Sequence, residues 1–280
     1  PARVALGVNA TEESVAELTT AMGLDRPLLA QYGEWLGGLV TGDFGVSLAS
    51  QQNITAQVID RAQVSLILVG VALLLALVIA IPLGMWTAQR KASISNALTQ
   101  LGIAIPSFLV GIILVAIFAV QLGWLPANGW SPPNQGVRAF LSHLVMPLIA
   151  LALVQGAILT RYVRSAILDV LNQDYIRTAR ALGQSPTGAL WRHGLRNAAL
   201  PVLTVAGVQF TTLIVGAVVI EEVFVIPGLG SMLLDAVSVR DLTTVQSLVM
   251  VLVAFTLTIN ALTDAAYRLI DPRLRQGARS

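Results

Sequence analysis

The residues with the most regular spacing lie in segment 162–199, between two apolar stretches. Three charged residues there, Asp174, Arg177 and Arg180, recur at every third position. In a helix this spacing puts them on one side and leaves the other side to apolar residues. The apolar residues are Tyr175, Ile176, Ala179 and Leu182. The pattern predicts a short amphipathic helix that binds another protein through its apolar face, with charge pairing at the rim.

The following residues predict where this helix ends and where a second one begins. Gly183 suits the left-handed position after a helix C-terminus. Ser185 followed by Pro186 is typical of an N-cap and a first helical residue. The second helix would set one group of apolar residues against two arginines, namely Trp191, Leu195 and Ala198 against Arg192 and Arg196. We expect two short helices around a glycine-centred turn; a solvated helix pair without a partner is the alternative.

Few residues could carry catalysis or hold a cofactor. A P-loop ATP site needs Gly-Lys-Ser/Thr, whose lysine reaches the phosphates, and the only lysine, Lys91, is followed by Ala92. The two histidines, His143 and His193, fall on opposite sides of the membrane in the topology below and cannot share a metal ion. There is no cysteine, which excludes disulfides and thiolate chemistry. We therefore expect no catalytic residue, metal site or cofactor in this chain.

A second set of candidates consists of polar residues within or at the end of apolar stretches. Gln155, Gln209 and Asn260 lie inside such stretches, and Glu221 and Glu222 end one of them. Polar residues in membrane helices usually hydrogen-bond neighbouring helices, and the glutamates could simply mark the edge of the hydrocarbon. The functional alternative is a solute pathway, with the glutamates at its outer mouth facing a cationic solute or an external partner.

Membrane helices must position all these residues. The 280 residues are 55% apolar and 11% charged, with a mean hydropathy of +0.76. A soluble domain is about 25% charged, so this composition excludes a disordered chain and argues against a soluble enzyme. Charge-free windows long enough to cross about 30 Å of hydrocarbon predict five spans in an all-α polytopic protein. The predicted spans are residues 64–88, 100–122, 140–161, 200–220 and 243–265. The first four contain a proline that we expect to kink the helix, namely Pro82, Pro106, Pro147 and Pro201.

The positive-inside rule orients these spans. One set of flanks carries 12 of the 17 basic residues: Arg90, Lys91, Arg161, Arg164, Arg177, Arg180, Arg192, Arg196, Arg268, Arg273, Arg275 and Arg279. The other flanks carry 11 of the 15 acidic residues. We therefore expect the C-terminus and segment 162–199 in the cytoplasm, with residues 1–63 and loop 123–139 outside. A polar external segment does not cross a membrane unaided, so we also expect a first membrane helix upstream of Pro1.

The chain would thus consist of an external helical segment, 1–63, and a membrane domain, 64–280. In the external segment Thr11 can N-cap a helix begun by Glu12 and ended by Gly23. A second helix near Pro27 would place several apolar residues on one face, namely Leu28, Leu29, Tyr32, Trp35, Leu36 and Leu39. We expect this face to pack on the spans; the membrane surface and an external partner are the alternatives.

Several stretches resemble one family. Residues 174–183 (DYIRTARALG) and 190–197 (LWRHGLRN), followed by Leu200-Pro201, resemble the cytoplasmic signature of ABC-importer permeases, and most closely the dipeptide, oligopeptide and nickel group. The resemblance extends over essentially the whole chain through four further stretches: residues 24–27 (LDRP), 42–45 (GDFG), 228–230 (GLG) and 271–273 (DPR). Where the broad importer signature has Glu-Ala-Ala, this chain has Arg177, Thr178 and Ala179, a departure that fits the peptide group.

The resemblance implies a type I importer fold and a non-catalytic permease subunit in a bacterial inner membrane. It also implies that this chain forms half of the translocation pathway for peptides, which an external binding protein delivers. The implied partners are that protein, a second homologous permease, two ATPase subunits that bind ATP and Mg²⁺, and membrane lipid, with no nucleic acid. In this family the region of Asp174–Gly183 forms a coupling helix that docks into a groove of the ATPase subunit.

Two alternatives stay open at this point. A stand-alone secondary transporter or channel normally carries ionisable residues inside its spans, and the span interiors here have none. Nickel or another small solute is the alternative substrate, because the permeases of this group look alike.

Overall fold

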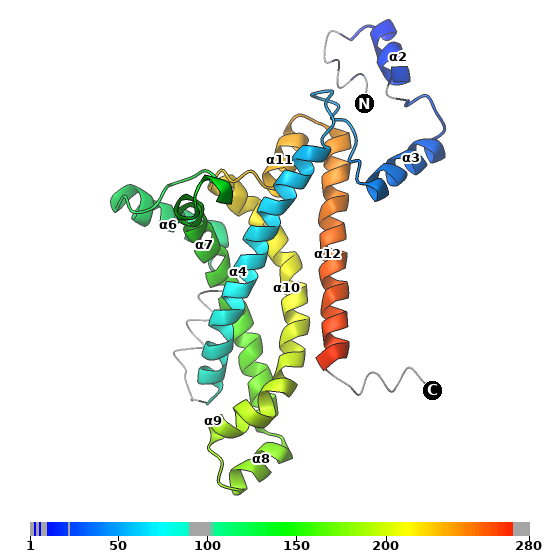
Figure 1. The fold of residues 1–280 in the computed structure, drawn as a ribbon. Coiled ribbons are helices and arrows are strands. Elements are labelled where there is room, and N and C mark those ends of the chain that lie inside the picture. Colours follow the sequence, from blue (N-terminus) through cyan, green and yellow to red (C-terminus); the bar gives the residue numbers. More distant parts are fainter. Residues whose placement is uncertain are drawn as a thin grey trace, which may run out of the picture. The chain divides into compact units, whose positions relative to one another are not determined.

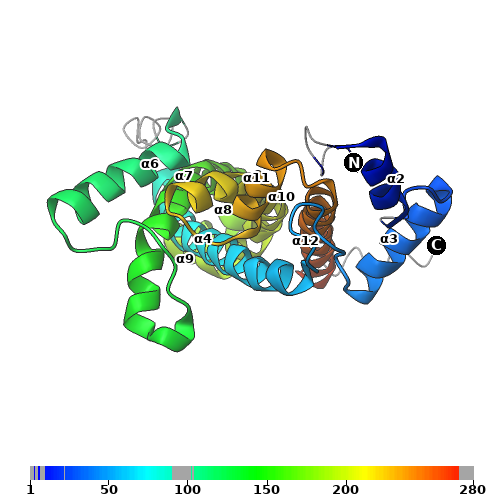
Figure 2. The same ribbon diagram turned by 90° about the horizontal axis from the view of Figure 1, so that it is seen from above.

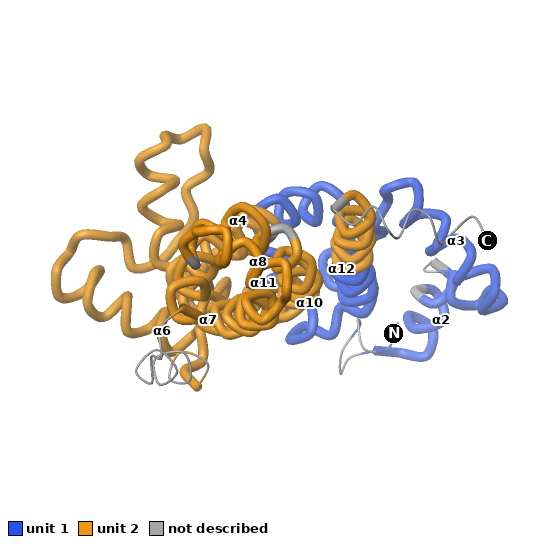
Figure 3. The backbone as a smooth tube through the Cα atoms, turned by 90° about the horizontal axis from the view of Figure 1, so that it is seen from below, with its two compact units in different colours: residues 1–65, 227–254 blue, residues 66–226, 255–280 orange. Residues whose placement is uncertain are grey.

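The computed structural model describes residues 3, 6, 10–21, 23–89, 102 and 104–270, and all regular elements among them are helical. One isolated antiparallel bridge, between Val46 and Asn53, is the only strand-like pairing in that part of the chain. The chain divides into two compact units (Figure 3). Unit 1 comprises Pro1–Ser65 and Pro227–Ala254, and unit 2 comprises Leu66–Ile226 and Phe255–Ser280.

Four long helices are apolar enough to cross a membrane (Figure 1). They are α4 (Thr55–Gln89), α7 (Val137–Leu171), α10 (Leu195–Val223) and α12 (Leu242–Ile270). They contain four of the five predicted spans, which are confirmed as apolar helices of sufficient length. Each helix is longer than the span predicted for it, because a helix can continue past the hydrocarbon into charged sequence.

The remaining predicted span, 100–122, is present as a shorter apolar helix. Helix α6 (Ser107–Leu114) continues through the π-helical stretch η2 (Val115–Gln121). Pro106 is the N-cap of α6 and does not kink it, whereas the other three prolines lie inside α4, α7 and α10 as predicted. Part of the span, residues 100, 101 and 103, lies outside the described residues, as do Arg90, Lys91 and the DPR motif with Arg273, Arg275 and Arg279.

The long helices of unit 2 pack through small residues. Ala76 and Ala80 of α4 have no exposed surface. A Cβ on Gly84 of α4 would come within 2.5 Å of Val163 Cγ1 on α7. Such close approach is typical of membrane helices, which associate by van der Waals packing rather than by the hydrophobic effect.

The loop between η2 and α7 lies at the edge of unit 2 (Figure 2). It contains a single 3₁₀ turn, η3 (Pro133–Gln135), and no longer helix, as its prolines and glycines predict. Trp130 packs edge-on against Phe140 at 5.5 Å between ring centroids, and Trp124 is 69% exposed. The Gly129 N–H donates a 2.8 Å hydrogen bond to the Phe224 carbonyl, which ties the loop to the end of α10.

Unit 1 contains several shorter helices. Helix α2 (Glu12–Ala21) is capped by Thr11, whose Oγ1 accepts the Ser14 N–H at 3.2 Å, and α3 (Leu28–Thr41) follows Pro27, both as predicted. A further short helix of this unit is α11 (Leu229–Ser238). Trp35 and Leu39 of α3 are half-buried, but no α3 residue is fully buried and Leu29 is 86% exposed, so the packing of the apolar face of α3 on the spans stays a prediction. The assignment of residues 1–63 to an external segment and 64–280 to a membrane domain stays a prediction.

Candidate functional site

The predicted amphipathic helix is present as α8 (Asp174–Ala181). Asp174 lies in its first turn and Arg180 in its last, where each charge is favourable to the helix dipole. Gly183 follows with φ +88°, and the Gln184 N–H reaches back to the Ala179 carbonyl at 3.2 Å. The left-handed glycine turn expected from the sequence is therefore confirmed.

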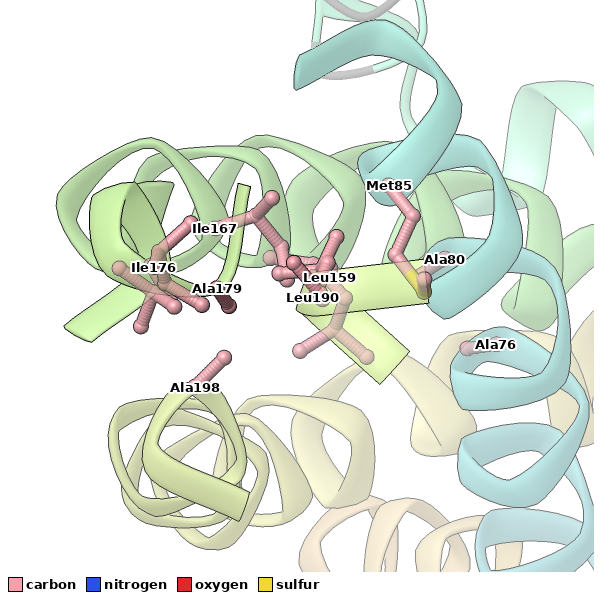
Figure 4. Packing of buried hydrophobic residues seen from close by; sticks show 13 residues of the cluster. Ala76, Ala80, Met85, Leu159, Ile167, Ile176, Ala179, Leu190 and Ala198 are labelled. Carbon is pink, nitrogen blue, oxygen red and sulfur yellow. The ribbon is translucent and has the colours of Figure 1, made fainter. Parts of the chain in front are cut away.

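The buried face of α8 packs on its own chain. Ile176 has no exposed surface and Ala179 is 6% exposed. Both lie in a cluster of buried side chains contributed by α4, α7, the first turns after Pro186 and α10 (Figure 4). Prominent neighbours are Ile167, Leu190 and Ala198.

This packing corrects the expected roles of Ile176 and Ala179. Both were predicted to face a partner protein, and instead they fill the interior beneath α8. The reason is that α7 continues to Leu171, ten residues beyond the predicted end of its span, so its last turns supply an apolar surface. Of the predicted coupling residues, five side chains remain on the surface: Asp174, Tyr175, Arg177, Arg180 and Leu182, of which Tyr175 is 39% and Leu182 80% exposed.

The second predicted helix is the start of a longer one. Helix α9 (Pro186–Ala189) begins at Pro186 as expected, but continues through the π-helical stretch η4 (Leu190–Gly194) directly into α10. Trp191 was expected on the face opposite Arg192, yet both are exposed, with Trp191 at 59%. A π-helical stretch contains an extra residue per turn, so the 3.6-residue periodicity used for the prediction does not hold across it. The side chain of Arg196 lies outside the described part of the structure.

Hydrogen bonds fix α8 and α9 to the long helices. The Asn197 Nδ2 group of α10 donates to the Tyr175 hydroxyl at 2.9 Å, and Thr187 Oγ1 donates to Gln89 Oε1 of α4 at 2.9 Å. Arg177 and Asp174 form an ion pair at 3.4 Å, but both are largely exposed, so it contributes little to stability. Helix α8 is thus held against α7 and α10 by buried packing and by a side-chain hydrogen bond.

The predicted pathway residues fall into different environments. Gln155 is 3% and Glu221 1% exposed, so in this structure neither has an open surface from which to line a pathway. Glu222 and Asn260 are exposed. Gln209 is half-buried. Its side-chain Oε1 and the side-chain Nε2 of Gln155 find no hydrogen-bond partner among the described residues.

A polar cluster in unit 1 escaped the sequence analysis. The buried carboxylate of Asp241, just before α12, accepts hydrogen bonds from the Ser47 and Thr244 hydroxyls and from the Leu48 and Thr244 backbone N–H groups. Burial alone would raise the pKa of Asp241, but these hydrogen bonds outweigh it and leave the pKa below its ordinary value of 3.8. The local signal was Asp241 three residues before Thr244, a spacing typical of a helix N-cap; the link to Ser47 has no local signal.

A second missed contact holds the start of α11. On α4, Arg61 donates to the Gly228 carbonyl at 3.3 Å and to Ser231 Oγ at 3.1 Å. One turn later, Ser65 Oγ accepts the Leu229 N–H at 2.8 Å. An α4 hydroxyl therefore satisfies one of the N–H groups that the first turn of a helix leaves unpaired, which the N-cap residue Gly228 cannot do because it has no side chain.

Comparison with known proteins gives consistent matches. The family described as "Binding-protein-dependent transport system inner membrane component" matches residues 76–276, and its N-terminal companion family matches residues 1–69. "Oligopeptide transport system permease protein AppB" of Bacillus subtilis is 40% identical over 259 residues, covering 90% of this chain and 82% of the relative. "Probable peptide ABC transporter permease protein y4tP" of Sinorhizobium fredii is 36% identical over 279 residues, covering 98% and 89%.

The fold is also shared with a solved structure. A chain of the inward-facing MetNI methionine ABC transporter matches with a TM-score of 0.64 and 17% identity, covering 78% of this chain and 98% of that one. At this identity the likeness shows the fold, which is that of an ABC-importer permease. Since one family covers most of the sequence and relatives of 36–40% identity cover at least 90% of it, this chain belongs to the family of binding-protein-dependent transport system inner membrane components.

Proposed function

We propose that this chain is a permease subunit of an ATP-driven importer, and that the importer takes up peptides. The observation that carries the proposal is the match to a relative named an oligopeptide permease, at 40% identity over 90% of this chain. The four long apolar helices are consistent with a multi-pass protein of the inner membrane. A stand-alone secondary transporter is not favoured, because this chain matches a family of transporters that depend on a binding protein.

In this proposal the chain itself is non-catalytic. ATP and Mg²⁺ bind to two partner ATPase subunits, a second homologous permease completes the pathway, and an external binding protein delivers the peptide. The exposed side of α8, with Tyr175, Arg177, Arg180 and Leu182, docks into a groove of an ATPase subunit. Its rigid attachment to α7 and α10 lets motion of the ATPase subunits reach the membrane helices.

The proposed orientation follows from the basic flanks and has a direct test. We expect Ser185, in the α8–α9 connection, to face the cytoplasm and Asn134, in the loop before α7, to face outward. Both residues are exposed and the chain has no cysteine, so Ser185→Cys and Asn134→Cys each introduce a single label site. A membrane-impermeant maleimide added to intact cells should label Asn134→Cys alone. Labelling of Ser185→Cys from outside would reverse the topology.

The docking role of α8 is tested best at its most exposed apolar residue. Burying a large apolar side chain contributes about 1.5–3 kcal/mol, and roughly every 1.4 kcal/mol changes affinity tenfold. We therefore expect Leu182→Asp to weaken co-purification with the ATPase subunits by about tenfold or more. Its thermal unfolding should stay that of the wild type, because Leu182 is 80% exposed in this chain.

Val137 provides the matched control for this experiment. It is 68% exposed and apolar, but begins α7 on the proposed outer side. Val137→Asp should therefore leave ATPase co-purification unchanged. Equal retention of the ATPase subunits by Leu182→Asp and the wild type would remove α8 from the proposed interface.

A further inference from the structure

Five helices in the described part of the chain end in the same type of turn. In each, a backbone N–H reaches back five residues to a carbonyl of the last turn, and the residue before that N–H has a positive φ. The helices α2, α3, α8, α10 and α11 place Gly23, Gly42, Gly183, Val225 and Arg240, respectively, at this left-handed position. Glycine, which lacks a Cβ, is thus used at three of these ends, and a β-branched residue at one of them.

The turn after α10 is complete in its hydrogen bonds and strained in its backbone. The Ile226 N–H donates to the Glu221 carbonyl at 2.8 Å, and the Val225 N–H donates to the Glu222 carbonyl at 3.2 Å. Val225 has φ +52°. A β-branched residue rarely adopts this region, because its branched side chain crowds the backbone there.

Nothing about the Val225 side chain offsets this strain. It is 63% exposed, so it gains little from burial in this chain. Arg240, the other non-glycine residue at such a helix end, is unbranched at Cβ and crowds its backbone less. The strain at Val225 is therefore imposed by its neighbours along the chain.

Both neighbours of Val225 are anchored. Phe224 and Ile226 are each 1% exposed, and the Phe224 carbonyl accepts the Gly129 N–H at 2.8 Å. The Phe224 ring lies so close to α6 that a Cβ on Gly111 would come within 3.0 Å of it. Pro227 disfavours a helical conformation at Ile226, and the division between the two compact units falls between these two residues.

We propose that the turn Glu221–Ile226 is a conformational switch. It is closed and strained in the state seen here, and it opens when Val225 leaves the left-handed region and the bond from the Ile226 N–H to the Glu221 carbonyl breaks. The strain brings the open state close in free energy to the closed one. The coupling of this opening to the transport cycle rests on the proposed function; the opening itself does not.

Relieving the strain should hold the turn closed. Val225→Gly removes Cβ, and Val225→Asn keeps Cβ but tolerates the left-handed region. Each should shift the equilibrium toward the closed turn by roughly 5–30-fold, the factor that corresponds to the usual cost of a left-handed residue. Val225→Thr keeps the β-branch and the shape, so its equilibrium should match the wild type.

Hydrogen exchange in the assembled transporter in nanodiscs measures the opening directly. The Ile226 amide should exchange roughly 5–30-fold more slowly in Val225→Gly and Val225→Asn than in the wild type and Val225→Thr. Arg240→Gly is the matched control, which should slow the Asp241 amide of its own turn and leave Ile226 unchanged. Unchanged Ile226 exchange in both the glycine and asparagine variants would overturn the switch.

ATPase stimulation in the same nanodiscs, with a tryptic digest of casein as the peptide source, tests the coupling. Stimulation should fall severalfold in Val225→Gly and Val225→Asn and persist in Val225→Thr and Arg240→Gly. Wild-type stimulation in all variants, together with slowed exchange, would overturn the coupling of the switch to transport. A wild-type transporter that peptides do not stimulate would count against the proposed substrate, and the exchange measurement would still decide the switch.

Discussion

Replacing Ile176 by aspartate should release α8 from the rest of the chain. Ile176 has no exposed surface and packs within the cluster that includes Ile167 and Leu190. The substitution removes this apolar contact and places a carboxylate where no basic partner is available in the cluster. The combined cost should be roughly 3–5 kcal/mol, which exceeds what a helix of eight residues can recover from its own hydrogen bonds.

Limited trypsin digestion of the purified membrane subunit in detergent would show this release. Cleavage after Arg177 and Arg180 should accelerate at least tenfold in Ile176→Asp, and ATPase co-purification should be lost with it. Thr178→Asp is the matched control, because it puts the same charge on an exposed position of the same helix. It should change stability by no more than about 0.5 kcal/mol.

The result separates two roles of Ile176. If it supports α8 from within, protease resistance and ATPase binding fall together. If it instead contacted the ATPase subunit directly, binding would fall while the isolated subunit kept its wild-type resistance to trypsin. The second outcome would contradict the burial seen here and restore the role predicted from the sequence.

The difference between these roles shows where sequence patterns stop being informative. The ends of α2, α8 and α9 were predictable, because Thr11, Gly183 and Pro186 act through their own backbone and the next few residues. The amphipathic pattern of α8 was also predictable. What the pattern could not give is the identity of the surface that covers Ile176, since that surface comes from α7 and α10.

The span boundaries show the same limit. Ending each span at its first charged residue located the hydrocarbon-crossing part of α7, but not its continuation past Arg161 to Leu171. Charge marks where lipid must end, and it does not end a helix. The π-helical stretch η4 has no sequence signal of its own, so the fusion of α9 with α10 and the exposure of Trp191 could not be derived from periodicity.

The contact between Asp241 and Ser47 joins residues 194 positions apart. Asp241→Asn should destabilise unit 1 by about 2–3 kcal/mol, because the carboxylate accepts several hydrogen bonds and bonds to a charged group are stronger than neutral ones. The asparagine would also direct an N–H₂ group toward donors already present. Thermal unfolding in detergent should show the loss, at roughly 2–4 °C for each kcal/mol.

Asp43 provides the control for this substitution. Its carboxylate also accepts hydrogen bonds from a backbone N–H, of Gly45, and from the side chains of Asn53 and Thr55, but it is exposed. Water can replace these partners, so Asp43→Asn should cost clearly less than Asp241→Asn. Equal losses in the two variants would show that burial of Asp241 contributes nothing.

The effect of Asp241→Asn should also depend on pH, in a direction that the hydrogen bonds fix. Because the folded-state pKa of Asp241 lies below its ordinary value of 3.8, the ionised carboxylate stabilises the fold at pH above that value. This stabilisation is lost as the pH falls through the folded-state pKa. The difference in unfolding temperature between the wild type and Asp241→Asn should therefore be constant from neutral pH down to about 5 and shrink below about 4. Asp43, whose pKa is lowered by its bonds to Gly45 and Asn53, is present in both proteins and cancels from the difference. A difference that grew as the pH fell would mean that the protonated form of Asp241 is the one that holds Ser47 and α12 together.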